Sequence, residues 1–363
     1  MQEINIRHII FTDRPEQEDR RALEVFYNMH GTSFLQHPEW KPTDPRISGL
    51  RYFFTKNEKG KILSSALIYE RDDRRADIYF GPLLSDESLL APSLTLISEY
   101  YKKKFFSHLN LNLPNHKEGH ILCSDSGFLK SLKAFKSDAA LNWATLKLNL
   151  AGIPGDEILN SFSVHHRKEI QRGLKAGLIV APLKENEIEE LALLHFKMYS
   201  HRGLQSSVEN AVKQYRSVYE FIKNTGKGFI SAVSDKEGRL LGGAAILYNH
   251  DAGYYYLGVA DPQERKLPIS YMALFDGIKQ AREAGLTYFD FGGYKLNASE
   301  TDQVAKINWF KEGFGGKLVV YPPTLQIILH PFLFRLTAFL KRLYSGFLFI
   351  RQRLFSRKVS TEK

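Results

Sequence analysis

The run RLLGGA, over residues 239–244, is the sequence's nearest match to a phosphate-binding loop. A loop of pattern Gln/Arg-x-x-Gly-x-Gly/Ala that opens a helix can cradle a pyrophosphate, because its backbone N–H groups and the helix dipole both favour anions. RLLGGA fits these letters, but it lies in the turn and second strand of a predicted hairpin, with no helix directly after it. Its N–H groups are therefore expected to bond within a sheet. We interpret the run as strand.

A phosphate-binding loop would instead be expected directly before the predicted helix over residues 268–285. That segment reads QERKLPIS, which contains no glycine, and Pro268 has no backbone N–H to donate. The composition of this loop argues against an acyl donor that is held by its pyrophosphate, such as acyl-coenzyme A.

Other chemistry-bearing residue types are sparse. The single cysteine, Cys123, cannot form an internal disulfide, and the twelve His show no CxxC or HExxH type of spacing. We therefore predict no metal and no resident cofactor. The N-terminal MQEINIRHII lacks the apolar run of a signal peptide, so a reducing, cytoplasmic location is expected.

The formal charge of +10 is unevenly distributed. From residue 331 onward, eight basic residues face a single acidic one, so seven of the ten net charges lie in the tail. The rest of the chain is mildly basic, which weakens a general nucleic-acid-binding interpretation.

The elements that must position a site occur twice along the chain. The first copy runs YFFTKNEKGKILSSALIYE, ADIYFGPLL, a helical SLLAPSLTLISEYYKKKF and HLNLNLP. The second runs GFISAVSDKEGRLLGGAAILYN, GYYYLGVAD, a helical PISYMALFDGIKQAREAG and LTYFDFGG. Each copy predicts a hairpin with a glycine turn (Gly60 and Gly238), a third strand, a helix and a fourth strand.

This duplication predicts an α/β (α+β) fold of two tandem domains, over residues 1–150 and 151–320, followed by a C-terminal segment over 321–363. The boundary rests on a loop with Gly152, Pro154 and Gly155 that follows a strand-like run. Two helical stretches, DEILNSFSVHHRKEIQRGLKAG and ENEIEELALLHFKMYSHRG, come before the strands of the second copy. This order is typical of acetyltransferase (GNAT-like) domains.

Five segments in order resemble the Fem family of peptidoglycan aminoacyltransferases. They are SFLQHPEW, IYFGPLLSD, HHRKEIQRGLKAGLIV, YYYLGVADPQERKLPISYMALFDGIKQA and YFDFGGYKLNASETDQVAKINWFKEGFGGKLVVY. The chain departs from the pattern at His165 and His166, where the family tends to carry more continuous Arg and Lys. The same scaffold also resembles acetyltransferases that modify sugars or polysaccharides.

The resemblance implies that Lys311, in the pair Phe310-Lys311, lies beside the transferred group and the tRNA end. When an amine attacks an ester carbonyl, negative charge develops on the oxygen, and a fixed cation in a dry cleft stabilises it. We predict Lys311 as the catalytic residue, in a cleft between the two halves. The plainer alternative is a solvated lysine next to a core phenylalanine.

The other predicted substrate-binding residues line this cleft in our interpretation. Strand alternation puts Tyr254 and Tyr256 on one face and Tyr255 on the other; the resemblance implies that Tyr256 lines the acceptor site. Arg202 and Lys41 are predicted to meet acceptor phosphates. Gln36 is expected to be more structural. Asp290 could orient the amine, or it could cap the loop that follows it.

The tail predicts a basic amphipathic helix. At 100° per residue an apolar stripe forms, made of Phe332, Leu336, Phe339, Leu340, Leu343, Phe347, Ile350 and Leu354. The longest uncharged run, LYSGFLFI, is far shorter than the ~20 residues that span a bilayer. Such a helix suits peripheral contact with the anionic inner leaflet, or alternatively packing of its stripe on the first domain.

Together these patterns predict an aminoacyltransferase that moves an amino acid from aminoacyl-tRNA to an amine of a lipid-linked peptidoglycan precursor. An alternative is acyl transfer from acyl-coenzyme A to an amino sugar of a surface polysaccharide. A third is a membrane-associated binding protein that kept the fold and lost catalysis. The sequence leaves the oligomeric state open.

Overall fold

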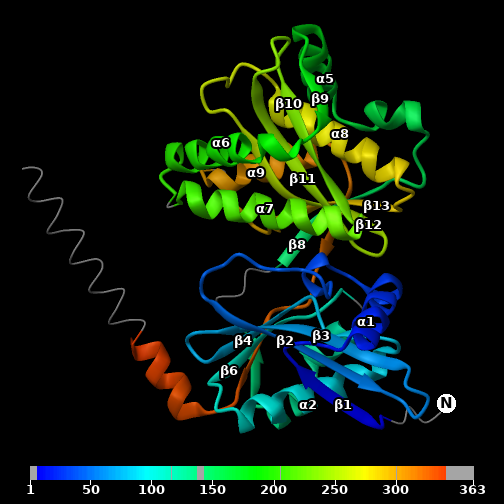
Figure 1. Cartoon of the computed structure of the whole chain (residues 1–363), viewed down its shortest axis with the longest axis vertical. Coiled ribbons are helices and arrows are strands. Elements are labelled where there is room, and N and C mark those ends of the chain that lie inside the picture. Colours follow the sequence, from blue (N-terminus) through cyan, green and yellow to red (C-terminus); the bar gives the residue numbers. More distant parts are fainter. Residues whose placement is uncertain (1–5, 116, 137–142, 205, 300, 341–363) are drawn as a thin grey trace, which may run out of the picture.

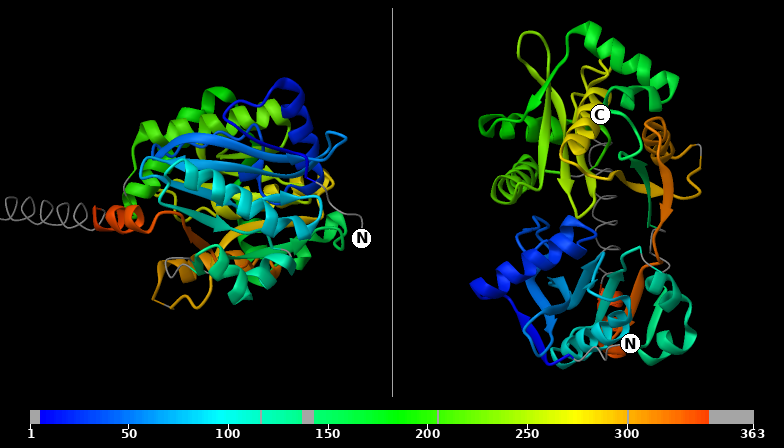
Figure 2. Two further views of the ribbon diagram at one scale, coloured as in Figure 1. Left: turned by 90° about the horizontal axis from the view of Figure 1, so that it is seen from below. Right: turned by 90° about the vertical axis from the view of Figure 1, so that its right-hand side faces the viewer.

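The computed structural model describes residues 6–115, 117–136, 143–204, 206–299 and 301–340. These residues form two α/β units stacked along the long axis of the molecule, each built on one sheet (Figures 1 and 2). The tandem arrangement predicted from the repeat is confirmed.

The first sheet has the strand order β1-β2-β3-β4-β6-β15-β7, with β5 paired to β3. Its strands are β1 (His8–Thr12), β2 (Ile47–Lys56), β3 (Ile62–Arg71), β4 (Arg75–Tyr79), β5 (Leu83–Leu84), β6 (His108–Asn112), β7 (Ala134–Lys136) and β15 (Leu325–Ile328). Its helices are α1 (Gln17–His30), α2 (Leu90–Lys103), α3 (Lys117–Ser124) and α4 (Ser126–Ser131).

The second sheet has the strand order β14-β8-β13-β12-β11-β10-β9. Its strands are β8 (Trp143–Asn149), β9 (Ile179–Pro182), β10 (Gly228–Ser234), β11 (Leu240–Tyr248), β12 (Ala252–Ala260), β13 (Tyr288–Lys295) and β14 (Lys317–Val320). Its helices are α5 (Val164–Ala176), α6 (Ile188–His201), α7 (Val208–Thr225), α8 (Ile269–Glu283) and α9 (Gln303–Glu312).

The predicted repeat corresponds to β2-β3-β4-α2-β6 and to β10-β11-β12-α8-β13. Gly60 and Gly238 both adopt positive φ in the hairpin turns, as their spacing predicted. Helix α8 begins directly after Pro268 and ends before Gly285, which has φ 78°. Local turn chemistry therefore fixes equivalent elements in both copies.

Each sheet includes one strand that lies, in sequence, beyond the predicted boundary of its domain. β8 lies before residue 150 but pairs with β13 and β14 in the second sheet. β15 lies after residue 320 but pairs with β6 and β7 in the first sheet. The boundaries at 150 and 320 stay a prediction, and the two sheets are linked by these crossing segments.

Helix α7 is absent from the predicted elements, although its signals are present in the sequence. Ser207 caps its start by accepting from the N–H of Asn210, and Gly226 ends it in the left-handed conformation. Helices α6 and α7 pack one face against the first unit. Their cluster joins Phe34, Trp40 and Tyr69 of the first unit to residues of the second, with the Trp40 and Phe221 rings 5.3 Å apart.

The C-terminal segment is helical over residues 331–340. The stripe residues Leu343, Phe347, Ile350 and Leu354 lie outside the described residues. Among the residues that are described, every helix falls short of the length and apolarity needed to cross a bilayer.

Candidate active site

The second sheet opens between two parallel strands. β12 and β13 pair at Ala252–Tyr288, Gly253–Phe289 and Tyr254–Asp290, and the ladder stops there. β12 continues to Ala260 along β11, while β13 continues along β8. The strands therefore separate beyond Tyr254 and Asp290 and leave an opening within the sheet.

A β-bulge marks the point where β12 leaves its neighbour. The register along β11 shifts between Ala245, opposite Leu257, and Ile246, opposite Tyr255, so Tyr256 is the extra residue. Bulges commonly re-aim side chains next to active sites. Tyr254 and Tyr256 still face the interdomain cluster and Tyr255 the opposite face, as alternation predicted.

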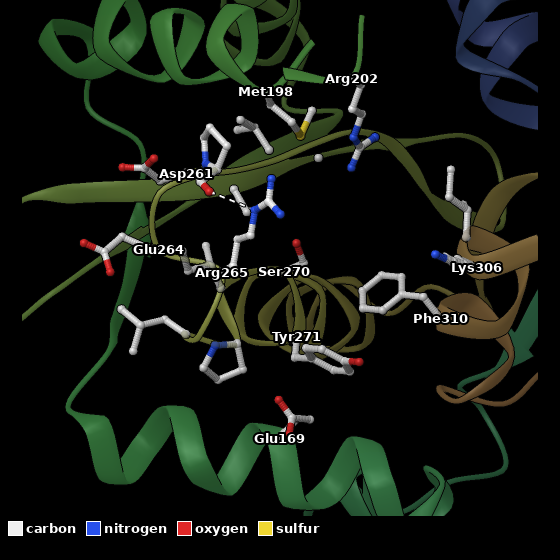
Figure 3. Close-up of a pocket in the computed structure, with 18 of the residues that line it drawn as sticks. Glu169, Met198, Arg202, Asp261, Glu264, Arg265, Ser270, Tyr271, Lys306 and Phe310 are labelled. Carbon is white, nitrogen blue, oxygen red and sulfur yellow. Dashed lines mark hydrogen bonds between the residues drawn. The ribbon is translucent and has the colours of Figure 1, made fainter. Parts of the chain in front are cut away.

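Beside this opening lies a cavity of about 770 Å³, which runs along the end of β12, the loop over residues 261–268 and the start of α8. Side chains from α5, α6, α8 and α9 surround its open centre (Figure 3). Three of the predicted site residues line it, namely Lys311, Phe310 and Arg202. Every residue that lines it belongs to the second unit, from Glu169 to Lys311.

This location corrects the expectation of a cleft between the two halves. Because the sheet of the second unit opens within itself, the cavity beside Lys311 is formed without the first unit. The sequence could indicate the duplication, but it carried no signal for where the ladder of β12 and β13 stops.

Lys311 is buried, with 7% of its side chain exposed. Its Nζ donates to the carbonyl oxygens of Gly293 at 2.6 Å and Gly292 at 3.1 Å. Burial lowers the pKa of Lys311 to about 8, and the nearby Asp290 opposes this shift. An ammonium has three N–H groups, and the described residues supply acceptors for two of them, which leaves one for a substrate oxygen.

Asp290 lies near this lysine and bonds to the loop beside it. Its Oδ1 accepts from the backbone N–H of Gly292 at 2.8 Å and from the Thr145 hydroxyl at 2.5 Å. This is the loop-capping role that the sequence offered as the alternative to catalysis. Burial raises the pKa of Asp290, and Lys147, 3.9 Å away, opposes the shift.

Phe310 is held at the cavity wall through its backbone. Its carbonyl oxygen accepts from Nε2 of the buried His166 at 2.8 Å, while the Nδ1 of the same ring lies 2.9 Å from the Ser163 hydroxyl. The Phe310 ring packs edge-on against Tyr271 at 5.0 Å. His166, where the chain departs from the Fem pattern, therefore fixes α9 to α5.

Several residues of the cavity were missed from the sequence. Tyr255 is one: a Cβ on Gly258 would lie 1.7 Å from its hydroxyl, so this ring covers Gly258 at the cavity wall. The two-residue period of a strand places Tyr255 on the face opposite Tyr254 and Tyr256. From the sequence we chose the face of Tyr256 for the site, so Tyr255 was missed. The further missed lining residues are Glu169, Arg172, His201, Arg265, Tyr271 and Lys306.

Charge at the cavity is mixed but leaves free cations. Arg172 pairs with Glu169 at 2.5 Å, and Arg265 contacts the ring of His201. In the described part of the chain, Arg202 and Lys306 make no ion pair. These two side chains are therefore available to an anionic substrate.

Most backbone N–H groups of the loop before α8 already have hydrogen-bond acceptors within the protein. The N–H groups of Asp261, Glu264 and Leu267 donate to carbonyl oxygens, and that of Gln263 donates to the Asp261 carboxylate. Pro262 and Pro268 have no N–H group. The N–H groups of Arg265 and Lys266 have no acceptor in the described part of the chain, but the loop contains no glycine that would let a pyrophosphate approach its backbone closely. RLLGGA lies in the ladder of β11, as predicted.

Of the remaining predicted residues, Tyr256 lines a second cavity, of about 390 Å³, between the two units, while Tyr254, Lys41, Gln36 and Asp290 are not among its lining residues. Tyr256 lines it together with Trp40 and Tyr69, and Gln214 Nε2 donates to its hydroxyl at 3.4 Å. Tyr254 packs in the interdomain cluster, 5.5 Å from the Phe34 ring. Neither tyrosine lines the cavity of Lys311, although the Tyr254 hydroxyl lies beside Gly292.

Lys41 and Gln36 belong to the same N-terminal motif but differ in role. Lys41 is exposed, and its carbonyl oxygen accepts from the Ser217 hydroxyl at 2.6 Å. Its neighbours Trp40 and Pro42 line the interdomain cavity. Gln36 is buried and bonds to the backbone of Leu67 and to the carbonyl of Tyr79, which fits the structural role expected for it.

Residues 161–300 match a protein-family model described as an acetyltransferase (GNAT) domain. The second unit is a GNAT acyltransferase domain. The matched residues include the opening between β12 and β13, the bulge at Tyr256 and most of the residues that line the larger cavity, although Phe310 and Lys311 lie beyond them. No match was found among curated protein sequences.

Solved structures share the fold of the whole chain. The crystal structure of FemX aligns with a TM-score of 0.73 at 16% identity, over 90% of this chain and 99% of that one. The C-terminal domain of a putative lysylphosphatidylglycerol synthetase from Agrobacterium fabrum aligns with a TM-score of 0.56 at 11% identity, over 88% of this chain and 96% of that one. A tandem GNAT protein from the clavulanic acid biosynthesis pathway aligns with a TM-score of 0.56 at 12% identity, over 89% of this chain and 99% of that one. The chain therefore has the tandem GNAT fold.

Proposed function

We propose that the GNAT acyltransferase domain of this chain transfers an amino acid from aminoacyl-tRNA to an amine of a lipid-linked peptidoglycan precursor. The observation that carries the proposal is the buried ammonium of Lys311 beside a cavity of about 770 Å³, with two of its three N–H groups satisfied by Gly292 and Gly293. Such a fixed donor suits an oxyanion that forms on an ester carbonyl.

In this proposal the acceptor amine attacks the ester carbonyl, and a C–N bond forms. The carbonyl oxygen gains negative charge and accepts a hydrogen bond from Lys311 Nζ. The C–O bond to the ribose then breaks, and the proton lost by the amine is taken up by the ribose oxygen. Lys311 remains protonated throughout, and no metal takes part.

The donor is assigned to the larger cavity and the acceptor to the interdomain cavity. Arg202 and Lys306 line the same cavity as Lys311 and suit the phosphates of a nucleic-acid end. The aromatic residues Trp40, Tyr69 and Tyr256 suit the apolar faces of a sugar or peptide acceptor. The two cavities lie on opposite faces of β12, and in this proposal the acceptor amine reaches the donor ester where β12 and β13 stop pairing.

Aminoacyl-tRNA is favoured over acyl-coenzyme A by the backbone of the loop before α8, because its N–H groups are mostly bonded or replaced by proline. The segments that resemble the Fem family add support, as does the fold shared with FemX and with a putative lysylphosphatidylglycerol synthetase. A cytoplasmic enzyme at the inner face of the membrane would meet such a donor and a lipid-linked acceptor.

A second candidate function is acyl transfer from acyl-coenzyme A to an amino sugar of a surface polysaccharide. The match of residues 161–300 to an acetyltransferase domain model is the observation that favours it. This reaction would use the same opening in the sheet, with the thioester carbonyl beside Lys311.

The two candidates differ in their donor, so a donor test separates them. Purified full-length protein is incubated with radiolabelled aminoacyl-tRNA and a precursor that carries the peptide amine, and label transfer is followed. In parallel, acetyl-coenzyme A is titrated calorimetrically. We expect label transfer and no saturable coenzyme binding; micromolar binding of acetyl-coenzyme A without label transfer would contradict the proposal.

A further inference from the structure

An exposed apolar surface lies on the first unit, away from both cavities' lining residues. It is formed by the helix over residues 331–340, where Phe332 is 77% exposed, Phe339 58%, Leu340 53% and Leu336 40%. Figure 2 shows this helix projecting from the side of the first unit. These four residues are the described members of the predicted apolar stripe, and they do not pack on the first unit.

The helix is anchored by its other face. Phe334 packs edge-on against His108 at 5.0 Å and against Phe135 at 6.3 Å. Before the helix, His330 bonds through Nε2 to the carbonyl oxygen of Lys102 at 2.8 Å. The exposed stripe is therefore held by the body of the protein.

Phe105 extends this surface beyond the helix. Its ring stacks on His330 at 5.3 Å, yet 65% of the residue remains exposed. It adopts φ 57°, a left-handed conformation that is rare for a large side chain. Together with the exposed residues of the helix, Phe105 forms an apolar patch of the kind that marks an interaction surface.

Basic residues surround these apolar side chains. The converging stretches over residues 101–110, 126–136 and 329–340 contain no Asp or Glu. Their exposed basic side chains are Lys102, Lys103, Lys104, Lys130, Lys133, Lys136 and Arg335. The sequence after residue 340 adds seven more basic residues against one acidic.

We propose that this surface, defined by Phe105, the exposed side chains of residues 331–340 and these lysines, docks on an anionic lipid bilayer. Protruding Phe and Leu side chains enter the boundary between headgroups and acyl chains, while the surrounding lysines meet lipid phosphates. A nucleic acid would satisfy the lysines but would leave Leu336 and Leu340 in water, and a second basic copy would oppose the charge.

The purpose of docking rests on the proposed function. A lipid-linked acceptor is confined to the membrane, and an enzyme that is held there meets it by diffusion in two dimensions. The lipid contact itself is independent of the acyl donor. Its test therefore uses no substrate.

The experiment is co-sedimentation of the full-length protein with vesicles of phosphatidylcholine, with and without about one-third phosphatidylglycerol. We expect binding to the anionic vesicles that weakens strongly near 1 M salt, where the Debye length falls to about 3 Å. Equal binding to both vesicle types, or no binding, would overturn the proposal.

Two variants locate the contact. Lys102→Glu/Lys103→Glu/Lys104→Glu should lower the partition coefficient at least about fivefold for each lysine. Phe105→Ser/Phe332→Ser/Phe339→Ser should lower it about tenfold or more. The matched controls are Lys59→Glu/Lys175→Glu and Val25→Ser/Met29→Ser, which alter exposed residues elsewhere and should bind as the unchanged protein does.

Truncation after residue 340 separates the described surface from the rest of the tail. Weakened but retained binding is expected. Complete loss, with no effect of the Lys102 variant, would assign the contact to the tail alone and overturn the proposed surface. A change of oligomeric state in the Phe105 variant, or reduced retention of bulk tRNA without reduced vesicle binding, would also overturn it.

Failure of docking can be told apart from failure of the proposed function. If the vesicle assay fails while label transfer to a soluble precursor persists, the docking surface is wrong and the enzyme assignment stands. The reverse outcome leaves a lipid-bound protein with a different activity.

Discussion

The two copies of the repeat share one topology, but they treat the same pair of parallel strands differently. In the first unit β4 pairs with β6 over all of its residues, from Arg75–His108 to Tyr79–Asn112. The N–H of Gly81, two residues after Tyr79, still donates to the carbonyl oxygen of Asn112. In the second unit the equivalent ladder stops after three pairs, and β12 runs on to Ala260 paired with β11 but not with β13. A duplicated sheet can thus be closed in one copy and open in the other.

Buried charge follows the same division. In the first unit Arg71 is paired with two carboxylates, those of Asp44 and Asp77, and also donates to the hydroxyl of Tyr79. In the second unit Lys311 has two carbonyl oxygens, and its pKa is lowered to about 8 by burial. In the closed copy the cation is paired with carboxylates of the same unit. In the open copy the ammonium has one N–H group left for a substrate oxygen.

The largest expected effect comes from removing that cation. Lys311→Met should lower kcat by about 10² to 10³, because the oxyanion loses its fixed donor. The KM for the donor should change little, since the interaction forms mainly in the transition state. Steady-state transfer kinetics measure both constants. The control Lys306→Met, on the exposed rim of the same cavity, should alter KM more than kcat; equal losses of kcat in both variants would remove the distinction.

The same lysine should leave a signature in stability. Since burial lowers its folded pKa to about 8 from 10.5, the folded protein binds fewer protons than the unfolded chain between these values. The cost of burying the ammonium is complete below pH 8 and disappears as the pH rises through this window. Relative to Lys311→Met, the unchanged protein should gain roughly 3 kcal/mol of stability across it.

Denaturant unfolding of both proteins at pH 7, 9 and 10.5 measures this difference. Other titrating groups are common to the two proteins and cancel in the comparison. Parallel stability curves would mean that Lys311 titrates normally and is not held in a dry site.

A smaller effect should follow from crowding the wall of the open copy. Gly258→Ala puts a Cβ within van der Waals overlap of the Tyr255 ring, so the ring must move and the cavity wall that it forms must change. Transfer activity should fall about tenfold while the protein stays folded by circular dichroism. Gly152→Ala, with open space around its Cβ, is the matched control; equal activity of the two variants would place the reaction elsewhere.

The smallest effect is expected in the closed copy. Thr324→Val removes the hydroxyl that accepts from Asn112 Nδ2 at 2.8 Å beside the last pair of β4 and β6. The free energy of unfolding should fall by about 1 kcal/mol, and kcat should be unchanged. A loss of kcat larger than the loss of folded protein would give the first unit a direct part in the chemistry.

Much of the fold could be predicted because its signals are local. The glycine turns at Gly60 and Gly238, the start of α8 after Pro268 and the repeated order of elements all lie in short windows of sequence. Helix α7 has equally local caps and was missed. The exchange of β8 and β15 between sheets depends on pairing over long separations, which no short window encodes.

The site was predicted less completely. Lys311, Phe310 and Arg202 do meet at one cavity, whereas Tyr256 lines another and Asp290 caps a loop. Where the ladder of β12 and β13 stops, and where β12 bulges, depends on packing against both neighbouring strands. For that reason Tyr255, whose letter is identical to those of its neighbours, could not be singled out.

The central claim, that acyl transfer takes place at the opening of the second sheet, can be tested by cross-linking. A tRNA analogue with a photoreactive aminoacyl group is irradiated with the full-length protein, and the labelled peptides are identified by mass spectrometry. The account predicts label in residues 255–271 and 303–311. Label confined to the interdomain residues 35–79, or to the first sheet, would contradict it.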